Sequence, residues 1–155
     1  MEIRAAEWPD LGCVARCEAA AFALAPATCA GGLAKTHTVL AAQIRAGEIY
    51  VATRSGSIVG FISACPNYEH LFVVAIAVQP PHQRQGIGSR LLAFAEKFAA
   101  ERGLDFVSLY SDGLNLSNTR FYTYRGYYET DRTEGPDFLR VYYSKDIAPV
   151  TARAA

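Results

Sequence analysis

The sequence predicts a single α/β domain in which helices flank a mixed β-sheet. The chain has 155 residues, of which 51% are hydrophobic, so it is long enough to bury one substantial core. Residues 71–78 are apolar on both strand faces, which is typical of a central strand buried from both sides. Residues 88–102 carry apolar side chains at helical spacing, and Gly103 ends that helix. Strand and helix patterns that alternate in this way favour an α/β sandwich.

Turn and cap residues divide the rest of the chain into elements. Pro9 and Asp10 are expected to begin the first helix, and Thr36 is expected to cap the second, which ends at Gly47. Ser55-Gly56 predicts the turn of a β-hairpin. The expected strands are residues 2–7, 48–54, 57–65, 71–78, 106–110, 127–133 and 138–145, and the expected helices are residues 9–22, 36–46, 88–102 and 117–125. The order is therefore β-α-α-β-β-β-α-β-α-β-β, with one domain over residues 1–147 and a flexible tail over residues 148–155.

Charge and hydropathy exclude several function classes. Lys plus Arg and Asp plus Glu number 15 each, and no basic stripe is present, so nucleic acid is not expected as a partner. A net charge of zero opposes self-association only weakly and leaves a homodimer open. The N-terminus has no basic start followed by an apolar run, and no apolar stretch approaches the ~20 residues of a membrane-spanning helix. We therefore expect a cytoplasmic protein with no membrane partner.

The four cysteines, Cys13, Cys17, Cys29 and Cys65, predict small buried or half-buried thiols rather than a metal site. A metal site would need further Cys or His residues at ligand spacing, and the sequence shows none nearby. No histidine stands at an obvious partner position for a nucleophilic cysteine. We therefore expect no metal.

A strand, a polar turn, two glycines and a helix follow one another at residues 76–89. The segment runs Ile76-Ala77-Val78, then Gln79 to His82, then Gln83-Arg84-Gln85-Gly86-Ile87-Gly88-Ser89. A helix N-terminus presents unpaired N–H groups, and glycines let the backbone approach a ligand, so the segment predicts a phosphate cradle to which Arg84 and Arg90 add positive charge. The segment does not match a dinucleotide-binding fingerprint, because Leu91 stands at the position of the third small residue. It does not match a nucleotide-binding P-loop either, because it has no Gly-Lys pair. A plain strand-to-helix turn is the alternative.

The segment resembles the acetyl-CoA motif of the GCN5-related N-acetyltransferases, the GNAT superfamily. That pattern is Gln or Arg, two residues, Gly, one residue, then Gly or Ala, and Gln83-Arg84-Gln85-Gly86-Ile87-Gly88 matches it. The resemblance implies the GNAT fold, with the backbone of residues 83–89 binding the pyrophosphate of acetyl-CoA. It also implies that Ile76, Ala77 and Val78 pair with the pantetheine arm as an added strand would.

A second segment resembles the family pattern N-x-x-A-x-x-F-Y-x-x-x-G-F. Here it reads Asn115-Leu116-Ser117-Asn118-Thr119-Arg120-Phe121-Tyr122-Thr123-Tyr124-Arg125-Gly126-Tyr127. Asn118 stands in place of Ala, and Tyr127 stands in place of Phe. The resemblance implies that Asn115 contacts the CoA arm and that Tyr122 protonates the departing thiolate. The alternative for Tyr122 is simple core packing with Phe121.

The base and the acceptor pocket are less well marked. Glu69 is the first candidate base and His70 the second, because residues 71–78 carry no ionisable side chain; a solvated turn is the alternative. Family resemblance places the acceptor between residues 22–35 and residues 130–138. Acidic side chains in or near these segments would suit a cationic amine with an apolar body, although they equally suit a solvated hairpin tip. They are Glu18, Asp131, Glu134 and Asp137.

The resemblance implies an acetyl-CoA-dependent N-acetyltransferase that acts on a primary amine of a small molecule by direct transfer. Backbone N–H groups near Val78 would polarise the thioester carbonyl. A protein N-terminal or lysine acetyltransferase is one alternative. A non-catalytic acyl-CoA-binding sensor is another; the lack of an ionisable group on residues 71–78 supports it, and Tyr122 argues against it.

Overall fold

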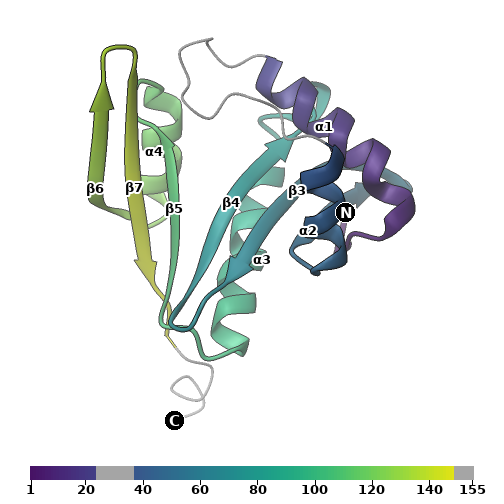
Figure 1. Ribbon diagram of the computed structural model, residues 1–155, viewed down its shortest axis with the longest axis horizontal. Coiled ribbons are helices and arrows are strands. Elements are labelled where there is room, and N and C mark those ends of the chain that lie inside the picture. The colour runs from purple at the N-terminus through teal and green to yellow at the C-terminus, as the bar shows by residue number, and fades with distance from the viewer. Residues whose placement is uncertain (24–36, 149–155) are drawn as a thin grey trace. The chain divides into compact units, whose positions relative to one another are not determined.

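The computed structural model describes residues 1–23 and 37–148, and the order of its helices and strands confirms the expected one (Figure 1). The strands are β1 (Glu2–Ala5), β2 (Ile49–Arg54), β3 (Ser57–Pro66), β4 (His70–Val78), β5 (Phe106–Asp112), β6 (Tyr128–Gly135) and β7 (Phe138–Asp146). The α-helices are α1 (Leu11–Ala23), α2 (His37–Arg45), α3 (Ile87–Glu101) and α4 (Leu116–Tyr124). The expected cap at Thr36 and the expected tail beyond Ala148 lie outside the described residues. Within those residues, no helix is long and apolar enough to span a membrane.

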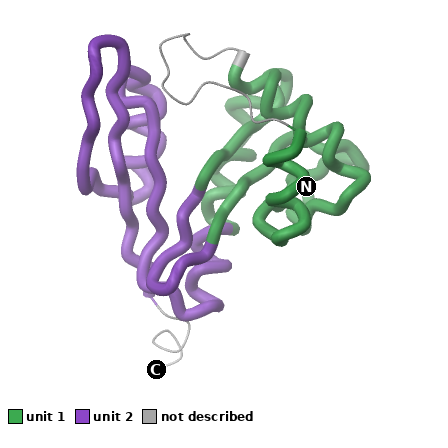
Figure 2. Tube along the Cα trace, viewed as in Figure 1, with its two compact units in different colours: residues 1–25, 33–65, 74–94 green, residues 26–32, 66–73, 95–155 purple. Residues whose placement is uncertain are grey.

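The described strands form one mixed sheet, as expected, with the hydrogen-bonded order β1-β2-β3-β4-β5-β7-β6. The pair β4–β5 is parallel, and the pairs β1–β2, β2–β3, β5–β7 and β6–β7 are antiparallel. The chain divides into two compact units (Figure 2). Unit 1 comprises Met1–Ala25, Leu33–Cys65 and Val74–Phe94, and unit 2 comprises Pro26–Gly32, Pro66–Val73 and Ala95–Ala155. Strand β4 and helix α3 each contribute to both.

Unit 1 is built on the hairpin β2–β3. Ser55 and Gly56 have φ angles of 52° and 79°, and two successive positive φ angles suit the tight hairpin turn that their sequence predicts. Helices α1 and α2 supply the apolar side chains that cover this hairpin. The buried cluster contains Ala6, Val14, Cys17, Leu40, Ile44, Ile49, Val51, Ile58, Phe61 and Ala77.

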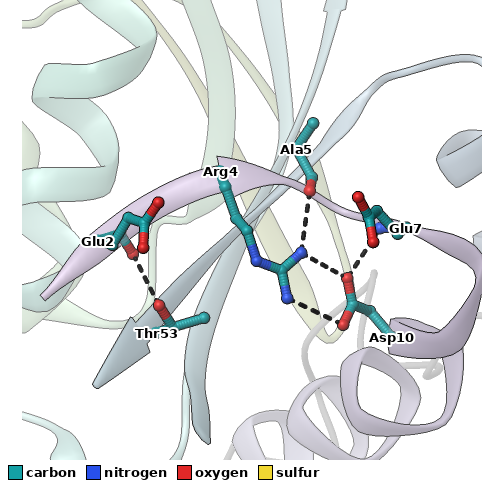
Figure 3. Close-up of polar contacts among 6 residues, drawn as sticks. All are labelled: Glu2, Arg4, Ala5, Glu7, Asp10 and Thr53. Atoms are coloured by element: carbon teal, nitrogen blue, oxygen red, sulfur yellow. Dashed lines mark hydrogen bonds and ion pairs between the residues drawn. The ribbon is translucent and has the colours of Figure 1, made fainter. Parts of the chain in front are cut away.

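A bidentate ion pair fixes the start of unit 1 (Figure 3). The Arg4 guanidinium donates to both carboxylate oxygens of Asp10, at 2.7 and 3.1 Å, and the Glu7 N–H donates to the same carboxylate at 2.8 Å. The hydrogen bond from Arg4 lowers the pKa of Asp10 below its usual value. The sequence predicts that Pro9 and Asp10 begin the first α-helix. They instead form a short 3₁₀ turn, Trp8–Asp10, because Asp10 is engaged in capping the residues before it.

Burial of β4 differs from the expectation that both of its faces are buried. Leu71, Val73 and Ala77 are at most 3% exposed, whereas Phe72 and Ile76 on the other face are only half-buried. The parallel ladder with β5 involves only His70–Val73 of the nine residues of β4. Apolar composition alone cannot distinguish a face that packs into a core from one that stays accessible, and this is why the prediction was wrong.

Unit 2 is centred on the antiparallel pair β5–β7. Val107, Leu109, Val141 and Tyr143 are at most 3% exposed and form its buried face. Strand β6 is the edge strand and is exposed over nearly its whole length, with a register shift between Glu129 and Asp131. Charged side chains and a bulge on an edge strand disfavour pairing with another chain. The last two strands, expected over residues 127–133 and 138–145, are both present, and β6 continues two residues further than expected, to Gly135, before β7 begins at Phe138.

One close backbone contact between β3 and β4 leads to a testable prediction. A Cβ atom at Gly60 would lie 2.8 Å from the carbonyl oxygen of Ala77, a distance that real Cβ atoms essentially never show. Gly60→Ala should therefore lower the free energy of unfolding by about 1–3 kcal/mol, because the backbone of β4 must shift. Chemical denaturation measures this change.

The matched control is Gly12→Ala, the same substitution within α1. There the nearest atom is the end of the flexible Arg16 side chain at 3.3 Å. Alanine is the better helix former, so this variant should be stabilised by roughly 0.5–1 kcal/mol. Equal effects of the two substitutions would contradict the close contact between Gly60 and β4.

Candidate functional site

The turn between β4 and α3 has the backbone geometry of an anion site. Gln83 is extended, with φ −69° and ψ 158°, whereas Arg84 and Gly86 have φ angles of 61° and 82°. Arg90 donates a helical hydrogen bond to the Gly86 carbonyl at 3.1 Å, and Ile87 is the first residue of α3. Alternating backbone handedness before a helix N-terminus turns N–H groups toward a common point.

Side chains of the motif itself hold this turn. Gln83 donates from Nε2 to the Val78 carbonyl at 3.0 Å, and Gln85 donates to the Pro81 carbonyl at 3.4 Å. Arg54, the last residue of β2, donates from Nη1 to Oε1 of Gln85 at 2.6 Å. Arg54 was not among the residues predicted from the sequence, because only the fold brings it to Gln85, 31 residues further along the chain.

The glutamine that follows β4 attaches the same turn to β3. The Gln79 N–H donates to the Val59 carbonyl at 2.9 Å, and its side-chain amide donates to the Ile58 carbonyl at 3.0 Å. The Ile87 side chain, 1% exposed, anchors the start of α3 in the core. The predicted cradle residues are therefore consecutive parts of one structured turn, fixed at both ends by unit 1.

The space and charge around this turn suit an anionic ligand. Nothing lies within 4 Å of the position that a Cβ atom at Gly86 would take. Arg84 and Arg90 are exposed, and Arg54 is half-buried beside Gln85. Guanidinium groups next to converging N–H groups are the usual partners of phosphate.

The three residues that end β4 combine one buried side chain with two accessible ones. Ala77 is 2% exposed, and its carbonyl lies 3.9 Å from the Cys17 thiol. Ile76 and Val78 are half-buried. All three lie beyond the residues of β4 that pair with β5, so their peptide groups on that edge are outside the parallel ladder.

In unit 2, Asn115 is the N-cap of α4. Its Oδ1 accepts hydrogen bonds from the N–H groups of Ser117 and Asn118, at 3.0 and 3.3 Å. These contacts fix the orientation of the side-chain amide and leave its nitrogen as the group that can donate to a ligand carbonyl.

Tyr122 lies in an aromatic cluster. Its ring centroid is 5.0 Å from that of Phe121, 6.0 Å from that of Tyr127 and 5.7 Å from that of Tyr143. Loss of hydration raises the pKa of Tyr122 to about 12, and Tyr143 adds to this while Arg125 opposes it. The phenol is therefore protonated at neutral pH, and the side chain is half-buried rather than fully enclosed.

The two candidate bases lie at the start of β4. Glu69 is exposed, and its carbonyl accepts from the Asp105 N–H at 2.7 Å. The His70 ring stacks on Phe106, with 4.7 Å between centroids and 3° between planes. The cradle residues occupy the other end of β4, so the roles of Glu69 and His70 stay predictions.

The predicted acidic side chains of the acceptor pocket have different environments. Glu18 is 1% exposed in α1, whereas Asp131, Glu134 and Asp137 are exposed on the β6–β7 hairpin. The exposure of these last three fits the alternative of a solvated hairpin. Residues 24–35 of the first expected pocket segment lie outside the described residues.

The cysteines of the described segments are free thiols. Cys17 is buried, and Cys13 and Cys65 are half-buried, as expected, while Cys29 lies outside the described residues. Burial raises the pKa of Cys17 to about 12, which makes its thiolate scarce at neutral pH. Across residues 1–23 and 37–148, no group of three or more His, Cys, Asp or Glu side chains is placed to hold a metal ion.

Comparison with known proteins agrees with the geometry. A family model described as the acetyltransferase (GNAT) family matches residues 19–127. The aminoalkylphosphonate N-acetyltransferase of Salmonella typhimurium is 34% identical over 84 residues. That alignment covers 50% of this chain and 54% of the relative, so it spans about half the length of each.

Solved structures share the fold across almost the whole chain. The ribosomal-protein-S18-alanine N-acetyltransferase of Escherichia coli superposes with a TM-score of 0.82 at 19% identity, covering 95% of this chain and 94% of that one. The protein yncA of Salmonella typhimurium, solved with its cofactor acetyl-CoA, gives a TM-score of 0.79 at 18% identity, covering 96% and 94%. The family match extends from α1 to the residue before β6 and includes both motifs. The chain therefore belongs to the GNAT family of acetyltransferases.

Proposed function

We propose that this protein transfers the acetyl group of acetyl-CoA directly to a primary amine of a small molecule. The observation that carries the proposal is the turn from Gln83 to Gly88, with positive φ angles at Arg84 and Gly86 and open space at Gly86. A diphosphate fits such a turn, because its charge is met by backbone N–H groups that no side chain shields. Family membership and the acetyl-CoA bound to yncA support acetyl-CoA as the source of that diphosphate.

The residues have separate roles in this proposal. The backbone of residues 83–89 and the nearby guanidinium groups hold the diphosphate. The peptide groups of Ile76, Ala77 and Val78 pair with the amides of the pantetheine arm, as an added strand would. The side-chain amide of Asn115 donates to a carbonyl of the same arm. The protein thus binds the cofactor chiefly through its backbone.

The reaction requires two proton transfers. The amine attacks the thioester carbonyl, a C–N bond forms, the C–S bond breaks, and backbone N–H groups near Val78 stabilise the carbonyl oxygen. Tyr122 donates its phenolic proton to the departing thiolate, a role that fits a phenol whose pKa is raised to about 12. Glu69 or His70 takes the proton from the amine. Their place at the start of β4 favours proton transfer through ordered water rather than by direct contact.

The name of the curated relative supports a choice of acceptor class. An aminoalkylphosphonate presents an amine and an anionic head on a short apolar chain, and that relative is named for such a substrate. We therefore propose a small aminoalkyl acceptor. Release of free thiol from acetyl-CoA with 2-aminoethylphosphonate, compared with an alanine-initiated peptide, tests this choice; turnover of the peptide alone would replace it with a protein N-terminal acceptor.

The cradle is tested by Gly86→Ala. A methyl group at Gly86 would project into the space that the diphosphate needs, at a backbone conformation that L-residues adopt reluctantly. We expect CoA to bind at least about tenfold more weakly by titration calorimetry. CoA should also raise the melting temperature of the wild-type protein, and this increase should shrink in the variant.

Gly47→Ala is the matched control, because Gly47 has a similar φ angle of 72° and open surroundings at the end of α2. It should lose a similar amount of stability, of order 1–2 kcal/mol, with no change in CoA affinity. Equal CoA affinity in Gly86→Ala and Gly47→Ala would contradict the assignment of the turn at Gly86 as the diphosphate cradle.

The acid is tested by Tyr122→Phe, which removes one oxygen and keeps the ring. Single-turnover acetyl transfer at saturating acetyl-CoA should slow by roughly 10²–10⁴-fold, while stability and CoA affinity stay close to wild type. Tyr124→Phe is the control, because Tyr124 is on the same helix and 90% exposed. If Tyr122→Phe instead loses stability and transfers acetyl at the wild-type rate, its role is core packing.

The base is tested by Glu69→Gln. The substitution should lower turnover at neutral pH and move or remove the acidic limb of the pH profile, because that limb reports ionisation of the base. Glu101→Gln, which changes another exposed acid, should leave the profile as it is. An unchanged profile in Glu69→Gln would assign the role to His70 or to water alone.

A further inference from the structure

Tyr127 carries a hydroxyl group that the resembled motif, with Phe at this position, does not require. The side chain is 3% exposed, so its oxygen must find a partner within the protein. The hydroxyl donates to Oε1 of Glu96 at 3.0 Å. Glu96 is on α3, whereas Tyr127 follows α4, so this hydrogen bond joins two helical segments of unit 2.

Glu96 is itself neutralised by a cation from the sheet. Lys145, on β7, donates from Nζ to Oε2 of Glu96 at 3.1 Å, and the same Nζ lies 5.7 Å from the centre of the Tyr127 ring. The two charged side chains are only 22% and 30% exposed. Burial and the bond to Glu96 raise the pKa of Tyr127, so its hydroxyl is a permanent donor near neutral pH. The Glu96 carboxylate thus fixes both the Tyr127 ring and the Lys145 side chain.

Tyr127 contacts Tyr122 through both its backbone and its ring. Its N–H donates to the Tyr122 carbonyl at 3.1 Å, and the two rings meet edge to face, with 73° between their planes. Tyr143, two residues before Lys145 on β7, lies against Tyr122 as well. The Tyr122 ring therefore contacts two tyrosine rings, and one of them, Tyr127, is hydrogen-bonded to the Glu96 carboxylate that pairs with Lys145.

The backbone at Gly126 makes this arrangement compact. Gly126 has a φ angle of 89°, and a Cβ atom there would lie 3.6 Å from Cε of Lys145. The chain can therefore end α4 at Tyr124 and place Tyr127, three residues later, on Glu96. Arg125, the residue that follows α4, has its guanidinium 3.8 Å from the centre of the Phe121 ring, and its charge lowers the pKa of Tyr122.

We propose that Tyr127, held by Glu96 and Lys145, is a positioning residue that keeps the Tyr122 phenol oriented for proton donation. The inference rests on the proposed role of Tyr122 as the acid. Aromatic contacts alone leave a ring free to tilt, whereas a hydrogen bond at the far end of Tyr127 fixes one wall of the Tyr122 site. A polar network with every member satisfied can rigidify a core in this way.

The test compares Tyr127→Phe with Tyr128→Phe. Both remove a tyrosine hydroxyl that donates to an acid at 3.0 Å, but Tyr128 is on the exposed edge strand and bonds to Asp146. Tyr127→Phe should slow single-turnover acetyl transfer by roughly ten- to a hundredfold, the cost of a slightly misplaced catalytic group, with the KM for acetyl-CoA unchanged. Tyr128→Phe should transfer acetyl at the wild-type rate. Glu96→Gln, which still accepts from Tyr127, should lose less activity than Glu96→Ala.

NMR of protein labelled with ¹³C at the tyrosine Cζ gives a readout independent of activity. The Tyr122 signal, assigned from its absence in Tyr122→Phe, should change its titration midpoint and its line width in Tyr127→Phe but not in Tyr128→Phe. If Tyr127→Phe only lowers the stability of the protein, and leaves the Tyr122 signal and the rate of acetyl transfer unchanged, the positioning role is overturned. If Tyr122→Phe proves fully active while the Tyr122 signal still responds to Tyr127→Phe, the assignment of Tyr122 as the acid fails and the structural coupling stands.

Discussion

The candidate site depends on how the chain passes from β4 into α3. It must leave a strand, reverse direction and begin a helix between Val78 and Ile87. Two residues in the left-handed region accomplish this, and one of them, Arg84, is not glycine. Such a conformation costs about 1–2 kcal/mol and persists only where the surroundings enforce it. The hydrogen bonds of Gln83 and Gln85 supply that enforcement, and Arg54 extends it to β2.

The residues of the proposed cradle and of the proposed acid belong to different compact units. The cradle and its supports belong to unit 1, and the tyrosine cluster with Asn115 belongs to unit 2. Each group is rigid for its own reason: the cradle through side-chain amides that bond to backbone carbonyls, and the tyrosine cluster through ring contacts and one ion pair. Strand β4 and helix α3 contribute residues to both units.

Sequence reasoning succeeded where the signal is local and failed where it depends on neighbours in space. The glycines at 47, 56, 86 and 103 all have positive φ angles, which is why turns and helix ends could be placed from the sequence. The accessible face of β4 could not be predicted, because the identity of an apolar side chain does not indicate whether another element packs against it. The Arg54–Gln85 and Tyr127–Glu96 contacts, each spanning 31 residues, were missed for a related reason. The family pattern has Phe where this chain has Tyr127, and this difference is the only sequence signal for the contact with Glu96, because a buried hydroxyl needs an acceptor.

The proposed recognition of the cofactor by the backbone would explain why the cofactor is easier to infer than the acceptor. A cradle made of N–H groups demands particular φ angles and open space, and these can be met by many sequences. The fold is accordingly shared at only 19% identity with a TM-score of 0.82. An acceptor amine is instead distinguished by side chains that match its charge and shape, and such side chains can change without disturbing the fold. The motifs of a chain like this one therefore define the donor of the acetyl group, while the choice of acceptor depends on residues that no motif contains.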